Sequence, residues 1–210
     1  MKISFHYRIV CIFFKLLFKI CYRGKIYGLE NIPENGGVIF ASNHVSHLDP
    51  PLIAVHSKRQ PVYSLARSTL FNKWNRWFYS RLYMVGINRE KGSDIHAIKE
   101  ILQLLKNGNA ISMFPEGTRS TTGIPQRGKK GIGLFVSRSQ VPVIPVRIFG
   151  TFEAFPKGAR FLNFKTHLTI VYGKPLYPQT FDTCMNTPDP IQAISDRIMQ
   201  EICNIQIPEK

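Results

Sequence analysis

The 210-residue sequence is poor in acidic side chains and in cysteine. Its 13 Asp and Glu residues accompany 28 Lys and Arg residues, which leaves a formal net charge of +15. Such a basic surface favours anionic partners: nucleic acid, anionic lipid headgroups, phosphorylated metabolites or an acidic carrier protein. The 4 cysteines form no C-x-x-C pair and lie toward the two ends of the chain. This spacing excludes a disulfide framework and a zinc knuckle, and it favours a reducing, cytosolic compartment.

Long apolar runs are missing as well. The longest one near the N-terminus is Ile9–Phe14, and Lys15 and Lys19 interrupt the region well short of the about 20 apolar residues that a membrane-spanning helix needs. A small-residue cleavage site does not follow, so a secretory signal peptide is not predicted either.

On a helical wheel the N-terminal region separates into a narrow basic strip and a broad aromatic and aliphatic surface. The strip holds Arg8, Lys15, Lys19 and Arg23, and the apolar surface holds Phe13, Leu16, Leu17, Phe18 and Ile20. Such a helix suits the plane of an anionic membrane surface; the alternative is a core helix with a solvated edge. We expect residues 1–27 to form a basic amphipathic membrane-associating helix with a linker, and residues 28–210 to form one domain.

Beyond this region, expected strands alternate with expected helices, which predicts an α/β fold: a single-domain sheet flanked by helices. Asp49 can cap a helix that starts with two prolines, Ser93 can cap another, and aromatic residues at helical spacing predict a third over 71–82, of the kind that usually packs in a core. The expected strands cover 38–42, 62–66, 110–114, 143–148 and 167–172, and the other expected helices start at 49 or cover 94–107 and 191–205.

A histidine and an aspartate follow the first expected strand, in the segment Asn43-His44-Val45-Ser46-His47-Leu48-Asp49-Pro50. Ligands of α/β folds gather at the carboxyl ends of strands. There Asp49 can accept the Nδ1–H of His44 and stabilise the imidazolium that forms when Nε2 takes a proton, so His44 is a candidate general base. Two other interpretations stay open: a strand terminator followed by an N-cap, or a metal-ligand cluster that includes His47.

A second polar segment, Phe114-Pro115-Glu116-Gly117-Thr118-Arg119-Ser120, follows another expected strand. Gly117 permits close backbone approach, while Thr118 and Arg119 can hydrogen-bond phosphate oxygens. The segment is not a Walker A loop, and by itself it could be a capped turn with a surface ion pair. The cations that follow either extend an anion-binding surface or are simply solvated: Arg127, Lys129 and Lys130.

Two further segments complete a recognisable order: Val85-Gly86-Ile87-Asn88-Arg89, a strand end with an arginine, and residues 141–146, a proline-edged strand. Together the four segments resemble the blocks of the glycerophospholipid acyltransferase family, in its bacterial 1-acyl-glycerol-3-phosphate branch. Asn43, His44 and Asp49 match N-H-x-x-x-x-D, and residues 114–120 match F-P-E-G-T-R-S in full. Gly86 and Arg89 match the second block with a shortened spacer. The blocks span about half of the chain.

The resemblance implies transfer of an acyl group from a thioester to the free sn-2 hydroxyl of 1-acyl-sn-glycerol 3-phosphate (lysophosphatidic acid), giving phosphatidate. It implies His44 as the base and Asp49 as its partner, and a glycerol phosphate held by Arg89, Glu116, Gly117, Thr118 and Arg119. The implied acyl side consists of Val143, Ile144, Pro145 and Val146. Neither metal nor cofactor is implied. The donor would be acyl-CoA or acyl carrier protein, and residues 28–210, the acyltransferase domain, would act on the cytoplasmic side of the cell inner membrane.

Three alternatives stay open. Acyltransferases for another lysophospholipid or for glycerol 3-phosphate share these blocks. A nucleic-acid-binding protein would need interleaved basic and aromatic residues or a known recognition module, and the sequence shows neither. A non-catalytic module for anionic membranes would leave His44 and Asp49 without a shared purpose.

Overall fold

The computed structural model describes residues 3–72, 75–88 and 94–209. The strands are β1 (Lys25–Tyr27), β2 (Val38–Ser42), β3 (Val62–Arg67), β4 (Met84–Ile87), β5 (Ala110–Met113), β6 (Val143–Phe149) and β7 (Thr169–Tyr172). The α-helices are α1 (Phe5–Leu16), α2 (Asp49–His56), α3 (Arg76–Arg81), α4 (Ile95–Lys106), α5 (Lys130–Ser139), α6 (Thr151–Ala154), α7 (Asp182–Met185) and α8 (Pro190–Asn204). A π-helical turn, Leu17–Cys21, continues α1, and 3₁₀ turns cover Leu29–Asn31, Ser68–Leu70 and Pro178–Phe181.

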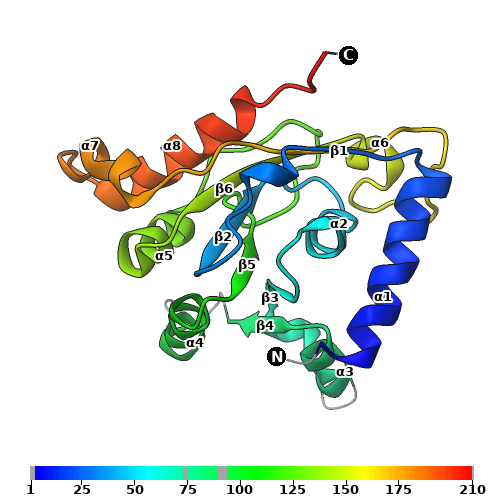
Figure 1. The fold of residues 1–210 in the computed structure, drawn as a ribbon, viewed down its shortest axis with the longest axis horizontal. Helices are drawn as coiled ribbons and strands as arrows, with labels where there is room; N and C mark the ends of the chain where they lie inside the picture. Colours follow the sequence, from blue (N-terminus) through cyan, green and yellow to red (C-terminus); the bar gives the residue numbers. More distant parts are fainter. Residues whose placement is uncertain (1–2, 73–74, 89–93, 210) are drawn as a thin grey trace.

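The strands form one sheet in the order β1-β7-β6-β2-β5-β3-β4, with helices on both faces (Figure 1). Neighbouring strands are parallel except for the antiparallel pair β6 and β7. A sheet that helices cover on both sides confirms the predicted fold class.

Strand β2 lies at the centre of the sheet, between β6 and β5, and all of its residues are buried. Because successive side chains of a strand point to opposite faces, Val38 and Phe40 enter the core beneath α2, while Ile39 and Ala41 enter the core beneath α4, α5 and α8. Two covered faces explain why this strand is a continuous apolar run in the sequence.

The sheet order brings the polar segments together. Strands β2, β5, β3 and β4 are parallel neighbours, so their carboxyl ends lie along one edge, and Ala41 pairs with Met113 near that edge. The segments that follow β2 and β5, residues 43–50 and 114–120, therefore start side by side. In α/β sheets this is the edge at which ligands bind.

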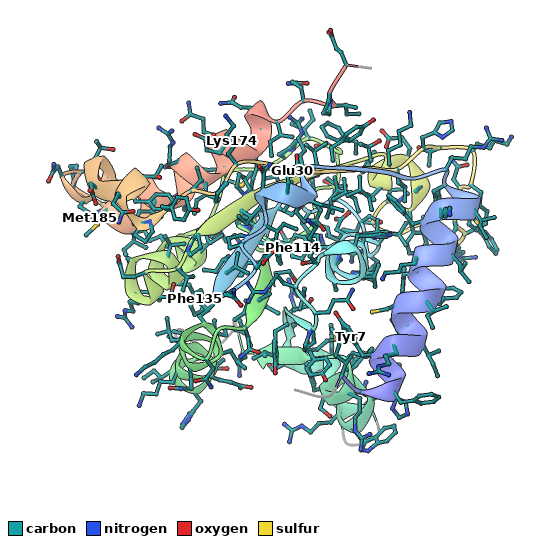
Figure 2. The ribbon with its side chains drawn as sticks, viewed as in Figure 1. Tyr7, Glu30, Phe114, Phe135, Lys174 and Met185 are labelled. Carbon is teal, nitrogen blue, oxygen red and sulfur yellow. The ribbon has the colours of Figure 1, made fainter. Side chains whose placement is uncertain are left out.

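The N-terminal helix α1 has one packed side and one exposed side. Tyr7 and Cys11 are buried against α2, and the Tyr7 hydroxyl donates to the carbonyl of Ala54 at 3.3 Å and accepts the Val62 N–H at 3.2 Å. In Figure 2, Tyr7 is labelled at the inner side of α1. Among the helices of the described residues, none is both long enough and apolar enough to cross a bilayer.

The helix predicted over 71–82 is wrong in its extent, since only α3 forms there. The side chains of Asn72 and Asn75 each accept the other's backbone N–H at 2.8 Å, and such side-chain bonds compete with helix formation, so the helix begins at Arg76. Trp77 and Phe78 are 54% and 40% exposed rather than packed in a core.

Three other local predictions are corrected. The cap of α4 is Asp94, whose carboxylate accepts the Ala97 N–H at 3.1 Å; Ser93 lies outside the described residues. Residues 25–27, expected in a linker, form β1 and pair with β7. Helix α5 occupies a stretch for which no helix was predicted.

Candidate active site

His44 and Asp49 meet as the sequence predicted. Nδ1 of His44 lies 2.9 Å from Oδ2 of Asp49, and the same oxygen accepts the backbone N–H groups of Val45 and Ser46, each at 2.8 Å. Asp49 is fully buried and does not cap α2; its carboxylate turns back toward His44. With Nδ1 held, Nε2 is the ring nitrogen left to exchange a proton.

The backbone of His44 is fixed from both sides by the second polar segment. Its N–H donates to Oε1 of Glu116 at 2.7 Å, and its carbonyl accepts the Ser120 N–H at 2.8 Å. The imidazole also stacks on the ring of Phe114, with centroids 4.1 Å apart. Figure 2 places Phe114 in the interior, near β5 and α2. The two segments therefore form one structural unit around the histidine.

Asn43 completes this unit from the other neighbouring strand. Its side-chain amide donates to the carbonyl of Ile148 at 3.0 Å and accepts the Ile148 N–H at 2.9 Å, which reproduces a backbone pairing with β6 beyond the end of β2. The residue before the histidine thus extends the sheet by one step, although its backbone has left the strand.

Glu116 is buried, and both of its carboxylate oxygens are engaged by backbone groups. Oε1 accepts the His44 N–H, and Oε2 accepts the Gln126 N–H at 3.0 Å. Burial raises the pKa of this carboxyl group, although the two backbone donors oppose that effect. The observed contacts are those of a residue that ties the loop to the histidine. Substrate binding by Glu116 stays a prediction.

Arg119 is the positively charged residue of the second polar segment. The pKa of its guanidinium is lowered, mainly by burial. Arg67 also lowers this pKa, whereas Asp49 opposes the change. Within the described residues its buried Nη1 has no hydrogen-bond partner. A guanidinium with a donor that the described residues leave unused can bind an anion, and this role of Arg119 stays a prediction. Arg67 belongs to no sequence motif that we recognised; only the sheet order, which puts the end of β3 next to β5, could have indicated it.

The other residues of the second segment have simpler surroundings. Gly117 has φ +70°, and its N–H donates to the carbonyl of Phe114 at 3.0 Å, so it forms a tight turn in a conformation that suits glycine. Thr118 is half-buried beside it. These positions agree with a role near the ligand, which stays a prediction.

The later cations of this loop comprise two that form surface ion pairs and one whose side chain lies beside Gly117. Arg127 pairs with Asp196 at 2.7 Å and Lys130 pairs with Asp189 at 2.5 Å, both on the surface and both toward α8. The N–H of Lys129 donates to the carbonyl of Pro115 at 2.8 Å, and its side chain lies against Gly117. The structure therefore favours surface residues for Arg127 and Lys130, whereas an anion-binding role of Lys129 stays a prediction.

Two predicted sets are not brought to the site by the described contacts. Arg89 lies outside the described residues. Val143, Ile144 and Val146 are fully buried in the middle of the sheet, with Pro145 between them. Their contacts are those of core residues, so their acyl-side role stays a prediction that rests on the resemblance.

A histidine–aspartate pair at the carboxyl ends of parallel strands is the arrangement expected of a general base in an α/β enzyme. The chain belongs to the acyltransferase family, because the family model described as "Acyltransferase" matches residues 23–149, more than half of its length. The matched region includes His44, Asp49 and residues 114–120.

Known proteins with similar sequences and structures carry closely related names. The 1-acyl-sn-glycerol-3-phosphate acyltransferase of Bacillus subtilis (strain 168) is 25% identical over 183 residues, which cover 87% of this chain and 87% of that protein. The chloroplastic 1-acyl-sn-glycerol-3-phosphate acyltransferase BAT2 of Brassica napus is 28% identical over 182 residues, which cover 85% of this chain but 52% of the plant protein. The chain thus spans about half of the length of this plant relative.

A solved structure extends the comparison to the fold. The crystal structure of the 1-acyl-sn-glycerophosphate (LPA) acyltransferase PlsC from Thermotoga maritima matches with a TM-score of 0.74 and 26% sequence identity, over 96% of this chain and 81% of that one. The match therefore covers nearly all of this chain.

Proposed function

We propose that this protein transfers a fatty acyl group from a thioester to the sn-2 hydroxyl of 1-acyl-sn-glycerol 3-phosphate and releases phosphatidate. The observation that carries the proposal is the 2.9 Å contact between His44 Nδ1 and Asp49 Oδ2, with Arg119 nearby, whose buried Nη1 has no hydrogen-bond partner among the described residues. The family membership and the names of the similar proteins support the same reaction.

In this reaction Nε2 of His44 takes the proton of the acceptor hydroxyl as its oxygen attacks the thioester carbonyl carbon. The new C–O bond forms, the C–S bond breaks, and the leaving thiolate takes up the proton from the imidazolium. Asp49 holds the ring in one tautomer and stabilises its transient positive charge. The protein need not form an acyl intermediate, because the thioester is already activated.

Arg119 and Arg67 bind the phosphate of the acceptor in this proposal, with Arg89 as a further predicted contact. Two guanidinium groups close enough to lower the pKa of one of them repel each other when the site is empty. A phosphate group removes that repulsion and accepts bidentate hydrogen bonds from each. In this proposal, binding of the phosphate also positions for His44 the sn-2 hydroxyl, which is on the carbon next to the one that carries the phosphate.

The membrane partner is an anionic lipid surface, which the exposed side of α1 contacts. That side carries a stripe of apolar residues between basic ones: Phe5, Ile9, Ile12, Phe13, Leu16 and Ile20, each at least 50% exposed. Apolar residues that face away from the core at helical spacing, next to Arg8, Lys15 and Lys19, are typical of an interfacial helix. Trp77 of α3 extends the stripe, because its ring lies 4.9 Å from that of His6.

The proposed location is the cytoplasmic side of the cell inner membrane, and the donor is acyl carrier protein or acyl-CoA. All four cysteines are free, in agreement with a reducing compartment. Both donors are anionic, so the net charge of +15 favours their approach.

The test is thioester-dependent acylation of lysophosphatidate in vesicles, with acyl-CoA and acyl carrier protein as alternative donors. Wild-type protein should form phosphatidate, and His44→Ala should lose about 10²–10⁴-fold in turnover, the usual contribution of a general base. His96→Ala, at an exposed position of α4, is the matched control. Equal turnover by His44→Ala and the control would overturn the mechanism. Acylation of glycerol 3-phosphate or of another lysophospholipid, but not of lysophosphatidate, would overturn the proposed acceptor.

A further inference from the structure

The loop that follows α6, residues 155–167, carries an aromatic side chain that is almost fully exposed. Phe161 is 85% exposed, and Phe164 is 50% exposed. The loop is nevertheless well anchored, because Phe155 and Leu162 pack against the core and the Asn163 N–H donates to the carbonyl of Ala154 at 2.8 Å. A fixed loop that packs Leu162 inward thus presents the adjacent Phe161 to its surroundings.

The charges of this loop have a single sign. Lys157, Arg160 and Lys165 are exposed, and the loop contains no acidic residue. Two exposed aromatic rings on a loop with three exposed cations and no acidic residue match the boundary between the headgroups and the acyl chains of an anionic bilayer.

The 155–167 loop packs against the segment that follows α1. The ring of Phe164 lies 5.4 Å from that of Tyr22, and the Leu168 N–H donates to the carbonyl of Tyr22 at 3.4 Å. Ile20 and Arg23 line a hollow of about 350 Å³ from one side, and the loop lines it from the other. In Figure 1 the segment after α6 accordingly lies next to the end of α1.

At its other end the loop touches the catalytic segment. The hydroxyl of Ser46 donates to the carbonyl of Phe155 at 2.7 Å, and Ser46 forms an isolated antiparallel bridge with Pro156. Ser46 also donates its N–H to the Asp49 carboxylate that holds His44. The loop therefore contacts Ser46, a neighbour of Asp49, at one end and the segment after α1 at the other.

We propose that the 155–167 loop is a second membrane-docking element, in which Phe161 and Phe164 enter the interface of an anionic bilayer while Lys157, Arg160 and Lys165 contact its headgroups. This proposal deepens, and rests on, the membrane association proposed above. Together with Ile20 and Arg23 the loop forms one continuous contact face. Because the loop is bonded to Ser46, docking on this face holds the catalytic segment next to the surface in which the lysophosphatidate resides.

The experiment is co-sedimentation of the full chain with vesicles of phosphatidylglycerol and phosphatidylcholine, compared with phosphatidylcholine alone. Phe161→Ser should weaken partitioning into the anionic vesicles about 10-fold, as expected for an aromatic side chain that is partly withdrawn from water. The triple change Lys157→Gln, Arg160→Gln and Lys165→Gln should weaken it on the order of 10–100-fold and make it less sensitive to salt.

The matched controls remove the same chemistry elsewhere. Met185→Ser acts on a 54% exposed apolar residue of α7, which Figure 2 shows at the opposite end of the molecule from α1. Lys99→Gln with Lys106→Gln removes two exposed cations of α4. Both controls should bind vesicles like the wild type. Every variant should acylate a short-chain lysophosphatidate that is dissolved as a monomer, since none of the changes touches the catalytic residues.

Each outcome has a distinct meaning. Loop variants that bind anionic vesicles as tightly as the controls would overturn the role of the loop and leave docking by α1 intact. Normal vesicle binding with a raised KM for acyl carrier protein would assign the loop to the donor and overturn our proposal. A wild-type protein that acylates lysophosphatidate without binding anionic vesicles would overturn membrane docking by both elements.

Discussion

Replacement of Glu116 by glutamine tests whether this residue binds substrate or positions the general base. In the structure Glu116 is 1% exposed, and its two oxygens accept the N–H groups of His44 at 2.7 Å and Gln126 at 3.0 Å. Glutamine has almost the same shape but only one oxygen. Whichever way its amide is turned, an NH₂ group faces one of the two donors, so that one N–H in contact with this buried side chain loses its acceptor.

The expected magnitude follows from this geometry. A buried donor without an acceptor costs about 1–3 kcal/mol, so the free energy of unfolding of Glu116→Gln should fall by that amount. The contact with the His44 N–H is the shorter one, and its loss lets the imidazole move relative to the acceptor hydroxyl. A displacement of about 1 Å can cost about 10²-fold, so we expect kcat to fall by about 10–100-fold while the KM for lysophosphatidate changes little.

The assay pairs urea unfolding with steady-state acylation of lysophosphatidate. Glu100→Gln, an exposed carboxylate on α4, controls for the loss of one negative charge. A side chain that binds the acceptor directly would behave differently from a positioning residue. A raised KM for lysophosphatidate together with an unchanged free energy of unfolding would refute the positioning role and restore Glu116 to the substrate-binding set.

Three further changes probe the neighbouring parts of the structure. Asn43→Asp puts a carboxylate against the carbonyl of Ile148 and should lower the free energy of unfolding by about 1–3 kcal/mol; equal urea midpoints for wild type and variant would contradict the sheet-extending contact. Arg119→Gln should raise the KM for lysophosphatidate by about 10–100-fold, whereas Arg127→Gln should leave it unchanged; equal KM values would remove Arg119 from the phosphate site. The hydrogen bond from Arg127 lowers the pKa of Asp196, so this pair stabilises the folded protein above the ordinary aspartate pKa and loses its effect as the pH falls below about 4. Arg127→Gln should therefore flatten the acid dependence of the melting temperature, and a parallel pH profile would contradict that linkage.

The parts of the fold that the sequence predicted are those with local signals. The strand over 38–42 shows as an unbroken apolar run because both of its faces are covered. Helix α4 shows as an apolar stripe at helical spacing. Strand β1 has only three residues, and its partner β7 is far along the chain, so no local pattern indicates it. The helix predicted over 71–82 is too long because the prediction rested on the aromatic spacing alone. The paired side chains of Asn72 and Asn75 delay the start of the helix.

The site divides in the same way. His44 and Asp49 are close in the chain, so their contact could be predicted from a strand-to-helix turn alone. Arg67 and Glu116 acquire their surroundings only from the order β2-β5-β3, which no local pattern specifies. The structure thus adds Arg67, which belongs to none of the motifs, as a candidate phosphate ligand. It also gives Glu116 contacts with the backbone of His44 that its motif did not suggest.

The two polar segments together fix the position of the His44 imidazole. Of the seven residues from 114 to 120, Phe114 stacks on the His44 ring, Glu116 accepts its N–H, and Ser120 donates to its carbonyl. Arg119 is the member of this segment whose buried Nη1 stays without a partner in the described part of the chain. The same loop thus contacts the histidine through three residues and carries the arginine that our proposal assigns to the phosphate. In the proposed reaction, the distance between His44 and Arg119 selects which hydroxyl of a glycerol phosphate is deprotonated, and hence which lysolipid reacts.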